Sequence, residues 1–246
     1  MTQPALRRGL VAGALATAGA WFVEPAEPAP DASPRATALP RAVVAVFGLA
    51  PGCGTTVVAR ALAAELAARD ASGTAAVACE ARTSGIPLAT QAASRLARAL
   101  EDLPGAATRA VGRVCLIEGA DQLTLAESSR QVAPLVMDAG SAALGGAPAS
   151  LADRTVLVAT QAVEPALARV AAECLARVGA ESIVVLNRAR TDGRAESGDD
   201  LTPPRSDFLP LPDSRLGAQL ALGGREARGE LGRAIATLAD RCDGVA

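Results

Sequence analysis

The chain lacks lysine, histidine and tyrosine altogether, and it has few other aromatic residues. All 24 basic residues are arginines, and there are one tryptophan and three phenylalanines among 246 residues. The absence of histidine excludes catalytic triads built on an imidazole and metal sites with histidine ligands. The absence of lysine excludes the usual lysine-containing phosphate-binding loop, however the sequence is aligned.

A surplus of charge of one sign is also missing. The formal net charge is −2 and the arginines are scattered along the chain, so no specific nucleic-acid partner is expected. The five cysteines are odd in number and have no C-x-x-C spacing, which is typical of reduced thiols in a cytoplasmic protein. The length suits one large α/β domain or two small ones, and one is the simpler interpretation.

The first 40 residues differ in composition from the rest. Residues 9–23 are uncharged and follow a pair of arginines, but a membrane span needs about 20 residues. The segment fits a secretory signal, a membrane-associating helix or a plain N-terminal helix or tail; the cytoplasmic character of the remainder argues against export. The following stretch is rich in proline and alanine, as linkers are. We therefore predict a hydrophobic segment at 1–23, a linker at 24–40 and a folded domain at 41–246.

From residue 41 onward, short apolar runs alternate with helical stretches. This alternation predicts a doubly wound, mostly parallel α/β sheet with helices on both faces. A polar, charged stretch at residues 189–206 is predicted to be a loop. Strands are expected at 42–47, 74–80, 113–119, 133–140, 154–160 and 182–188, and helices at 57–70, 87–103, 164–179 and 225–242.

A glycine-rich stretch, VFGLAPGCGTT at residues 46–56, joins the first expected strand to the first expected helix. It resembles the phosphate-binding pattern G-x-x-x-x-G-K-[ST], in which main-chain N–H groups bind phosphate, the lysine neutralises it and the last hydroxyl holds Mg²⁺. Gly52, Gly54 and Thr56 keep the first and third parts of this pattern. Thr55 stands in the lysine position, and Gly48 lies one residue before the position of the opening glycine.

The loss of the lysine predicts nucleotide binding without fast turnover. Removing one preorganised donor to a transition state slows an enzyme by about 10² to 10³-fold, and removing a full charge costs at least as much. The same glycines would also serve an ordinary tight turn between a strand and a helix. Cys53, within the loop, is either a reactive thiol at a helix N-terminus or a small filler residue.

The loop and the features after it resemble the MinD/ParA group of P-loop ATPases, which includes septum-site, chromosome-partitioning and CpaE-like pilus-assembly proteins. The group's K-G-G-x-G-K-T-T motif falls on residues 50–57, so Ala50 and Thr55 replace both of its lysines. The group's later motifs are matched in order by APLVMDAG, IVVLNR and LPLPDS. The resemblance implies a P-loop NTPase fold over residues 41–242 and a site for ATP or ADP with Mg²⁺.

The resemblance also implies roles for four residues beyond the loop. Asp138 would bind a water of the Mg²⁺ ion, and Asn187 would contact the adenine base. Pro210 and Asp213 would lie near the base, although they are one residue too far apart for the group's I-P-x-D motif. From the residues alone, Asp138 could instead cap the turn after its strand, and Asn187 could cap a loop.

The group's D-x-D acids fall on Glu80 and Arg82. An arginine cannot position an attacking water as an acid does, so Arg82 is either a solvated charge or a phosphate-facing group that partly replaces the lysine. The predicted function is therefore that of a degenerate MinD/ParA-like protein, at most a weak ATPase, in septum placement, partitioning or pilus assembly. The alternatives are an active ATPase that uses an arginine in place of the lysine, and a nucleotide-free scaffold.

We expect the protein to be cytoplasmic, at the inner face of the membrane if residues 9–23 contact lipid. The expected partners are the nucleotide and either a second copy of the chain or another protein of a positioning or assembly system.

Overall fold

The structure, a computed structural model, describes most of the expected folded domain. It covers residues 41–79, 89–140, 144, 146–163, 165–189 and 208–243. Within these residues, no helix is both long enough and apolar enough to cross a membrane. The expected N-terminal segment 1–23, the linker 24–40, Glu80, Arg82 and the expected loop after residue 189 lie outside the described residues.

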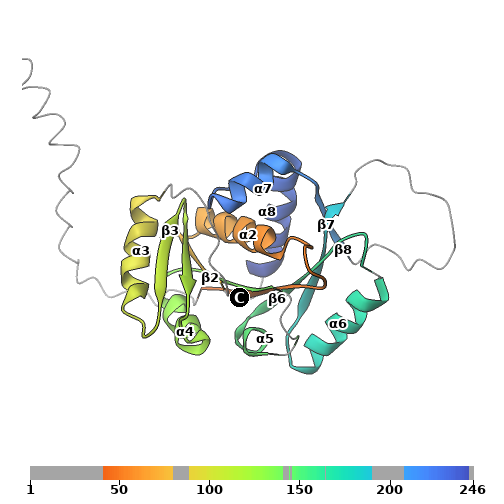
Figure 1. Ribbon diagram of the computed structural model, residues 1–246, viewed down its shortest axis with the longest axis horizontal. Coiled ribbons are helices and arrows are strands. Elements are labelled where there is room, and N and C mark those ends of the chain that lie inside the picture. The colour runs from red at the N-terminus through yellow and green to blue at the C-terminus, as the bar shows by residue number, and fades with distance from the viewer. Residues whose placement is uncertain are drawn as a thin grey trace, which may run out of the picture. The chain divides into compact units, whose positions relative to one another are not determined.

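The described strands form one eight-stranded sheet, in the order β3-β4-β2-β5-β1-β6-β7-β8 (Figure 1). Every neighbouring pair is parallel except β3 and β4. Parallel strands are covered on both faces by their crossover helices, which explains the continuous apolar runs in the sequence. The strands are β1 (Val43–Gly48), β2 (Ala75–Cys79), β3 (Ala107–Val111), β4 (Val114–Glu118), β5 (Leu135–Gly140), β6 (Arg154–Ala159), β7 (Ser182–Ala189) and β8 (Phe208–Pro212).

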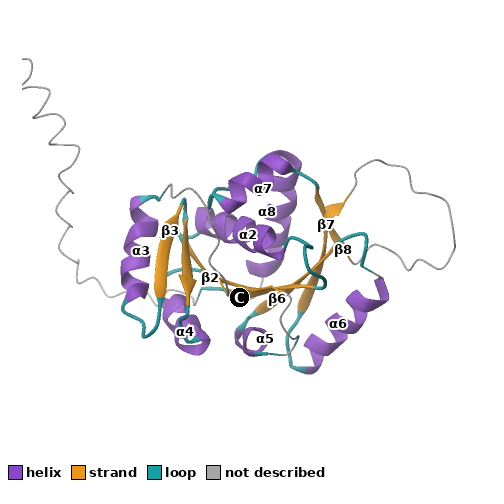
Figure 2. Cartoon of the chain, viewed as in Figure 1, coloured by secondary structure: helices purple, strands orange, loops and turns teal. Residues whose placement is uncertain are grey.

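Helices cover both faces of this sheet (Figure 2). One face carries α2 (Thr55–Arg69), α7 (Arg215–Leu222) and α8 (Gly229–Asp243), and the other carries α3 (Gln91–Glu101), α4 (Gln122–Val132), α5 (Ala147–Leu151) and α6 (Pro165–Arg177). α2 packs against the sheet and also against α7 and α8, so most of its residues are buried. The predicted doubly wound α/β fold is confirmed, and each expected strand and helix is present to within a few residues.

The sequence did not predict β3, β8, α4, α5 or α7. Pro210 and Pro212 lie in β8, and proline argues against a central strand because it has no N–H to donate. β8 is an edge strand, where the outward-facing N–H groups need no partner and prolines are tolerated. β3 forms the opposite edge, and a turn at Gly112, whose φ is 56°, connects it to β4.

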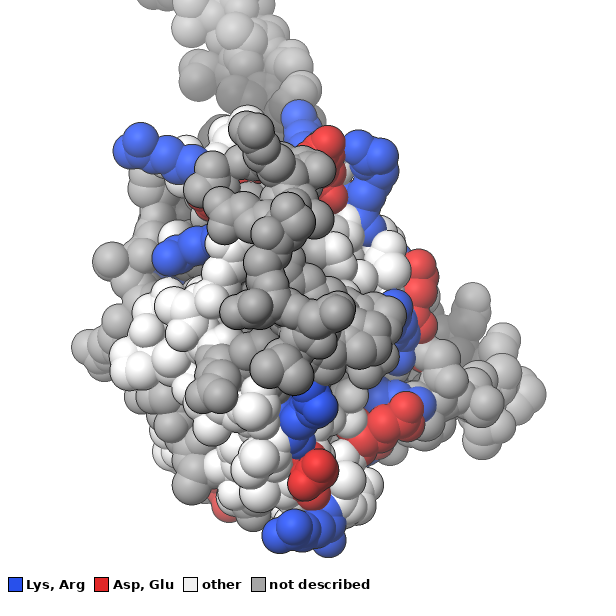
Figure 3. Space-filling view, turned by 90° about the vertical axis from the view of Figure 1, so that its right-hand side faces the viewer, with Lys and Arg blue, Asp and Glu red and all other residues white. Residues whose placement is uncertain are grey.

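Acidic and basic side chains lie next to one another on the surface. Figure 3 shows this mixing on the side of the molecule that carries α6, β7 and β8. Arg113 and Glu226 form one exposed pair of this kind in the described part of the chain, with Arg113 Nε and Glu226 Oε1 3.0 Å apart. Exposed pairs of this kind contribute only about 0 to 1 kcal/mol each, so the buried apolar core is the main source of stability.

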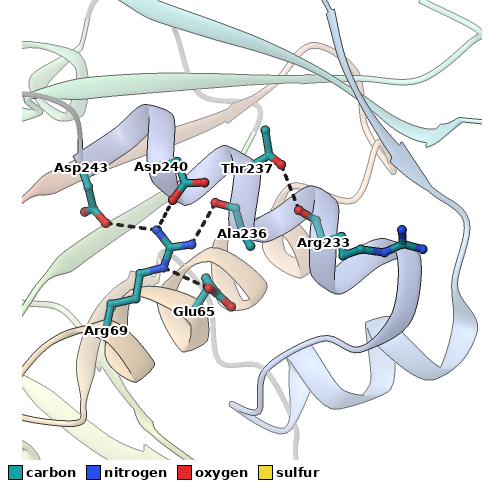
Figure 4. A network of polar contacts seen from close by, with 7 residues as sticks. All are labelled: Glu65, Arg69, Arg233, Ala236, Thr237, Asp240 and Asp243. Atoms are coloured by element: carbon teal, nitrogen blue, oxygen red, sulfur yellow. Dashed lines mark hydrogen bonds and ion pairs between the residues drawn. The ribbon is translucent and has the colours of Figure 1, made fainter.

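Arg69, in the last turn of α2, connects α2 to α8 (Figure 4). Its Nε donates to Glu65 Oε1 at 3.0 Å, and its Nη1 donates to Asp240 Oδ1 at 2.6 Å. Its Nη2 donates to the carbonyl of Ala236 at 3.0 Å. One guanidinium therefore joins two helices that are far apart in the sequence and fixes how α8 lies on α2.

Asp70, directly after α2, binds the start of β1. Arg41 Nε donates to its Oδ2 at 2.8 Å, and the N–H of Ser72 donates to its Oδ1 at 2.8 Å. Burial alone would raise the pKa of Asp70, but the bonds from Ser72 and the bond and charge of Arg41 outweigh it and lower the pKa below its ordinary value. The ionised form of Asp70 therefore stabilises the folded chain.

We expect Asp70→Asn to lower the free energy of unfolding by about 1 kcal/mol at pH 7. Because the folded pKa is depressed, this contribution is present above the unfolded pKa of about 3.9 and is lost as the pH falls through the folded value. Urea denaturation at pH 7, 5 and 3 measures it, with the exposed Asp102→Asn as control. A difference in the free energy of unfolding between wild type and Asp70→Asn that stays constant down to pH 3 would contradict this account.

Candidate functional site

The glycine-rich loop leaves β1 at Gly48 and enters α2 at Thr55. Gly52 and Gly54 have φ values of 77° and 91°, a left-handed conformation that residues with a side chain rarely adopt. A Cβ added to Gly52 would meet no atom within 4 Å, so the space beside this glycine is open. The two glycines thus give the chain a turn that brings its main chain to the surface at the mouth of α2.

The first N–H groups of α2 have no acceptor within the described part of the chain. Val58 is the first residue of the helix whose N–H reaches a carbonyl of the described residues, that of Gly54 at 3.1 Å. The N-cap residue, Gly54, makes no side-chain cap. Helix geometry leaves the earlier donors without a partner inside the helix. Together with the helix dipole, such donors favour an anion at this end of α2.

The side chains of Cys53 and Thr55 pack in the protein interior beside Gly48. The Cys53 Sγ and Thr55 Oγ1 atoms lie 3.3 Å apart, and both residues are buried. A Cβ added to Gly48 would lie 2.3 Å from Thr55 Oγ1 and 2.8 Å from Cys53 Sγ. Cys53 is thus placed as the filler residue of our two alternatives, and Thr55 can offer a ligand its main-chain N–H rather than its hydroxyl.

Asn187, near the end of β7, holds the loop. Its Nδ2 donates to the carbonyl of Cys53 at 2.8 Å, and its Oδ1 accepts from the N–H of Arg188 at 3.0 Å. A Cβ added to Gly54 would lie 2.3 Å from Asn187 Nδ2, so glycine is required there for this contact. Both ends of the buried amide bind the protein, which is the loop-capping arrangement rather than a free group aimed at a base.

Arg188 follows with a φ of 57°, and it is the non-glycine residue with positive φ among those described. The register between β7 and β8 shifts at this point, between Asn187 and Ala189. Such an irregularity re-aims side chains at the end of a strand. Here it allows Asn187 to turn toward the loop while Arg188 lines a neighbouring cavity.

That cavity, of about 50 Å³, lies beside Gly54, and Asn187, Arg188, Pro212 and Asp213 are among its lining residues. The structure thus brings Asp213 next to the loop, and its place near a base stays a prediction. Pro210 is exposed and is not among the residues that line the cavity, whereas Pro212 is. The resemblance to the I-P-x-D motif pointed to Pro210, the first proline of LPLPDS. The position of Pro212 directly before Asp213 was the signal that could have pointed to Pro212.

Asp138 lies near the end of β5, in register with Val46 of β1 and Cys79 of β2. The N–H of Gly140, the last residue of β5, donates to its Oδ1 at 3.3 Å. Asp138 also lines a cavity of about 280 Å³ at the carboxyl ends of β2, β4 and β5, together with Cys79 and Gln122. Ligands of open α/β sheets bind at this edge.

The chemistry available beside Asp138 is limited. Burial raises the pKa of the Cys79 thiol to about 11, so this thiol is neutral at pH 7 and a poor nucleophile. Among the described residues, no group of three or more His, Cys, Asp or Glu side chains could hold a metal ion. A divalent ion at this edge would need oxygen ligands from a bound phosphate in addition to Asp138.

Among the solved structures with a similar fold, some are nucleotide complexes. The septum site-determining protein MinD from Pyrococcus horikoshii, complexed with Mg-ADP, has a TM-score of 0.56 and 16% identity, with 83% of this chain and 97% of that chain covered. An ATP complex of the D38A variant of McdA from Cyanothece has a TM-score of 0.55 and 14% identity, covering 84% and 97%. A ParA family ATPase from Chlorobium tepidum has a TM-score of 0.50 and 16% identity, covering 81% and 98%.

These similarities confirm the predicted MinD/ParA-type P-loop fold. No protein-family model matches the sequence, and no curated protein does.

We expect Asn187→Ala to destabilise the chain by about 1 to 3 kcal/mol, because the carbonyl of Cys53 loses its buried donor. The loop should also open more often, so the amides that follow Cys53 should exchange hydrogen faster. Urea denaturation and hydrogen exchange measure both effects. Arg188→Gly is the control: glycine accepts the positive φ, and this change should be neutral or slightly stabilising. Unchanged stability and exchange in Asn187→Ala would show that the loop holds its shape without Asn187.

Proposed function

We propose that this chain, which has the fold of the MinD and ParA ATPases, binds ATP or ADP through main-chain amides and hydrolyses it slowly or not at all. The observation that supports this proposal best is the mouth of α2. There the loop is held in a left-handed turn at Gly52 and Gly54, the space beside Gly52 is open, and the first helix donors have no acceptor among the described residues. The helix dipole adds partial positive charge at the same place.

The residues present fit a nucleotide with Mg²⁺ in part. Mg²⁺ keeps several waters and is usually held by one or two protein oxygens together with the phosphates. The Thr56 hydroxyl, at the start of α2, and the Asp138 carboxylate, at the end of the neighbouring β5, are the groups that would hold it or its waters. Bound there, Mg²⁺ would neutralise phosphate charge.

The base would lie on the side of the loop where Pro212 and Asp213 line the small cavity beside Gly54. Asn187 would support this side indirectly, since its amide already binds Cys53 and Arg188. Its contribution is to fix the loop against β7, so that the main-chain donors keep their direction without any contact from Asn187 to the base.

Slow hydrolysis follows from the missing charges. Neither Ala50 nor Thr55 can neutralise charge that develops on a transferring phosphoryl group, and the Thr55 hydroxyl is engaged with Cys53. The arginine at position 82 cannot supply the second acid of the D-x-D motif. Losses of this kind each slow phosphoryl transfer by about 10² to 10³-fold or more.

A protein that binds nucleotide with little turnover suits a positioning or assembly role, in septum placement, partitioning or pilus biogenesis. In this role the chain would present a nucleotide-dependent surface to a second copy or to another protein. Residues 9–23 would hold it at the inner face of the membrane.

A nucleotide-free scaffold is the second candidate. It is favoured by the packing of Cys53 and Thr55 beside Gly48, because these side chains close the interior under the loop without a ligand. The two functions differ in one measurable property, which is whether the wild-type chain binds a nucleotide.

We expect calorimetric titration to show ADP and ATP binding by the wild-type chain. We expect Thr55→Lys to bind ATP about tenfold more tightly or better, because its longer side chain does not fit the interior site beside Gly48 and must turn out toward the open side of the loop. A lysine adds a charge-assisted bond to phosphate of about 1.5 to 3 kcal/mol. Thr55→Met, with a long side chain but no charge, is the matched control and should gain nothing.

A turnover assay of the same three proteins tests hydrolysis, which should stay slow in all three, because Thr55→Lys restores neither the lysine that is missing at Ala50 nor the second acid of the D-x-D motif. If neither wild type nor Thr55→Lys binds nucleotide at millimolar concentration, with or without Mg²⁺, the scaffold is the correct alternative. Fast turnover by wild type would instead identify an active ATPase.

A further inference from the structure

Arg60 is a buried charge in the second turn of α2. Its side chain is 1% exposed and is the largest fully buried side chain among the described residues. Its Nη1 donates to the carbonyl of Leu222, the last residue of α7, at 2.8 Å, whereas its Nε and Nη2 have no hydrogen-bond partner among the described residues. Buried donors without an acceptor are costly, and a single donor would suffice to bind α7. Two of the three guanidinium nitrogens are thus buried without an acceptor among the described residues.

The position of Arg60 places it under the mouth of α2. It follows Thr56 by four residues, so the two side chains lie on the same stripe of the helix. It follows Thr55 by five residues, which is about 7.5 Å along the helix axis. Side chains of a helix lean toward its N-terminus, which in α2 is the glycine-rich loop.

The ends of β2 and β5 lie on the same side of the sheet as Arg60. Cys79 and Asp138 are in register with each other. Val77 and Val136, two residues before them, belong to the core cluster that contains α2, and alternate residues of a strand point to the same face. Asp138 thus faces the helix from which Arg60 projects.

The electrostatics of Arg60 agree with this placement. Burial lowers the pKa of its guanidinium, Cys79 and Asp138 act to raise it, and Arg109 acts to lower it. An arginine starts so high that it stays protonated in a protein. Because burial keeps the Cys79 thiol neutral, Asp138 is the nearby acid that acts on this charge, and it is also a residue that would face Mg²⁺ or its waters.

We propose that Arg60 supplies, from inside α2, the positive charge that the loop lacks at Thr55, and that it thereby helps to hold a phosphate group at the mouth of the helix. It is a positioning residue, since the phosphate touches the main-chain amides and not the guanidinium. Over a distance of this order the field of a buried charge is little screened by salt. This role rests on the proposed nucleotide binding and deepens it.

The test uses Arg60→Gln, which keeps a polar side chain in place of the guanidinium but has no charge. We expect it to bind ADP, without Mg²⁺, about tenfold more weakly than wild type. Arg60→Lys keeps the charge and should bind within about threefold of wild type. Arg95→Gln, which removes an exposed charge on α3, is the matched control and should have no effect. Where the glutamine variant does not fold, Arg60→Met replaces it, because methionine leaves no orphaned donor.

A second readout separates charge from structure. In Thr55→Lys the loop has its own charge, so adding Arg60→Gln should cost clearly less affinity than it does in the wild-type background. Equal ADP affinity of wild type and the neutral variants would overturn the role of Arg60 and leave the proposed function standing. Equal losses in both backgrounds, or failure of Arg60→Lys to restore binding, would show that Arg60 acts through structure alone. Absence of ADP binding by wild type itself would overturn the proposed function.

Discussion

The main-chain path from Gly48 to Thr55 is the constraint on which the site depends. Three contacts fix it: the Cys53 and Thr55 side chains meet beside Gly48, the amide of Asn187 binds the carbonyl of Cys53, and Gly54 leaves room for that amide. None of them uses a charged group. The shape of the loop is therefore set by packing and by one neutral hydrogen bond, in a chain that contains no lysine.

The distribution of charge follows from this arrangement. Without an ammonium group at the loop, the positive potential at the mouth of α2 comes from the helix dipole and the unpaired donors of its first turn. Arg60 adds a full charge one turn below, and Asp138 stands at the end of the adjacent strand. Fixed dipoles and a buried charge can hold an anion, but they cannot follow charge as it moves in phosphoryl transfer. This is why binding and slow turnover go together in the proposed function.

The alternation of apolar runs was enough to predict the fold, because strands buried on both faces cannot be polar. It missed β8, whose prolines are tolerated only at an edge, since strand order is not visible in a single sequence. The spacing of Gly52, Gly54 and Thr56 predicted the loop. The binding of Asn187 to Cys53 could not be predicted, because it depends on a contact across 134 residues of sequence. The direction of the Thr55 side chain depends on the exact path of the loop, which the glycine spacing does not fix. Arg60 had one signal, as a lone charge between Val57 and Ala64 in an otherwise apolar helix.

The central claim is that main-chain N–H groups at the start of α2 bind a nucleotide phosphate in the absence of a lysine. Hydrogen exchange of the wild-type chain, measured residue by residue with and without ADP, tests it most directly. The account predicts that ADP slows exchange at residues 52–57 more than elsewhere in the described domain. Unchanged exchange at these amides under saturating ADP, or protection confined to another part of the chain, would contradict it.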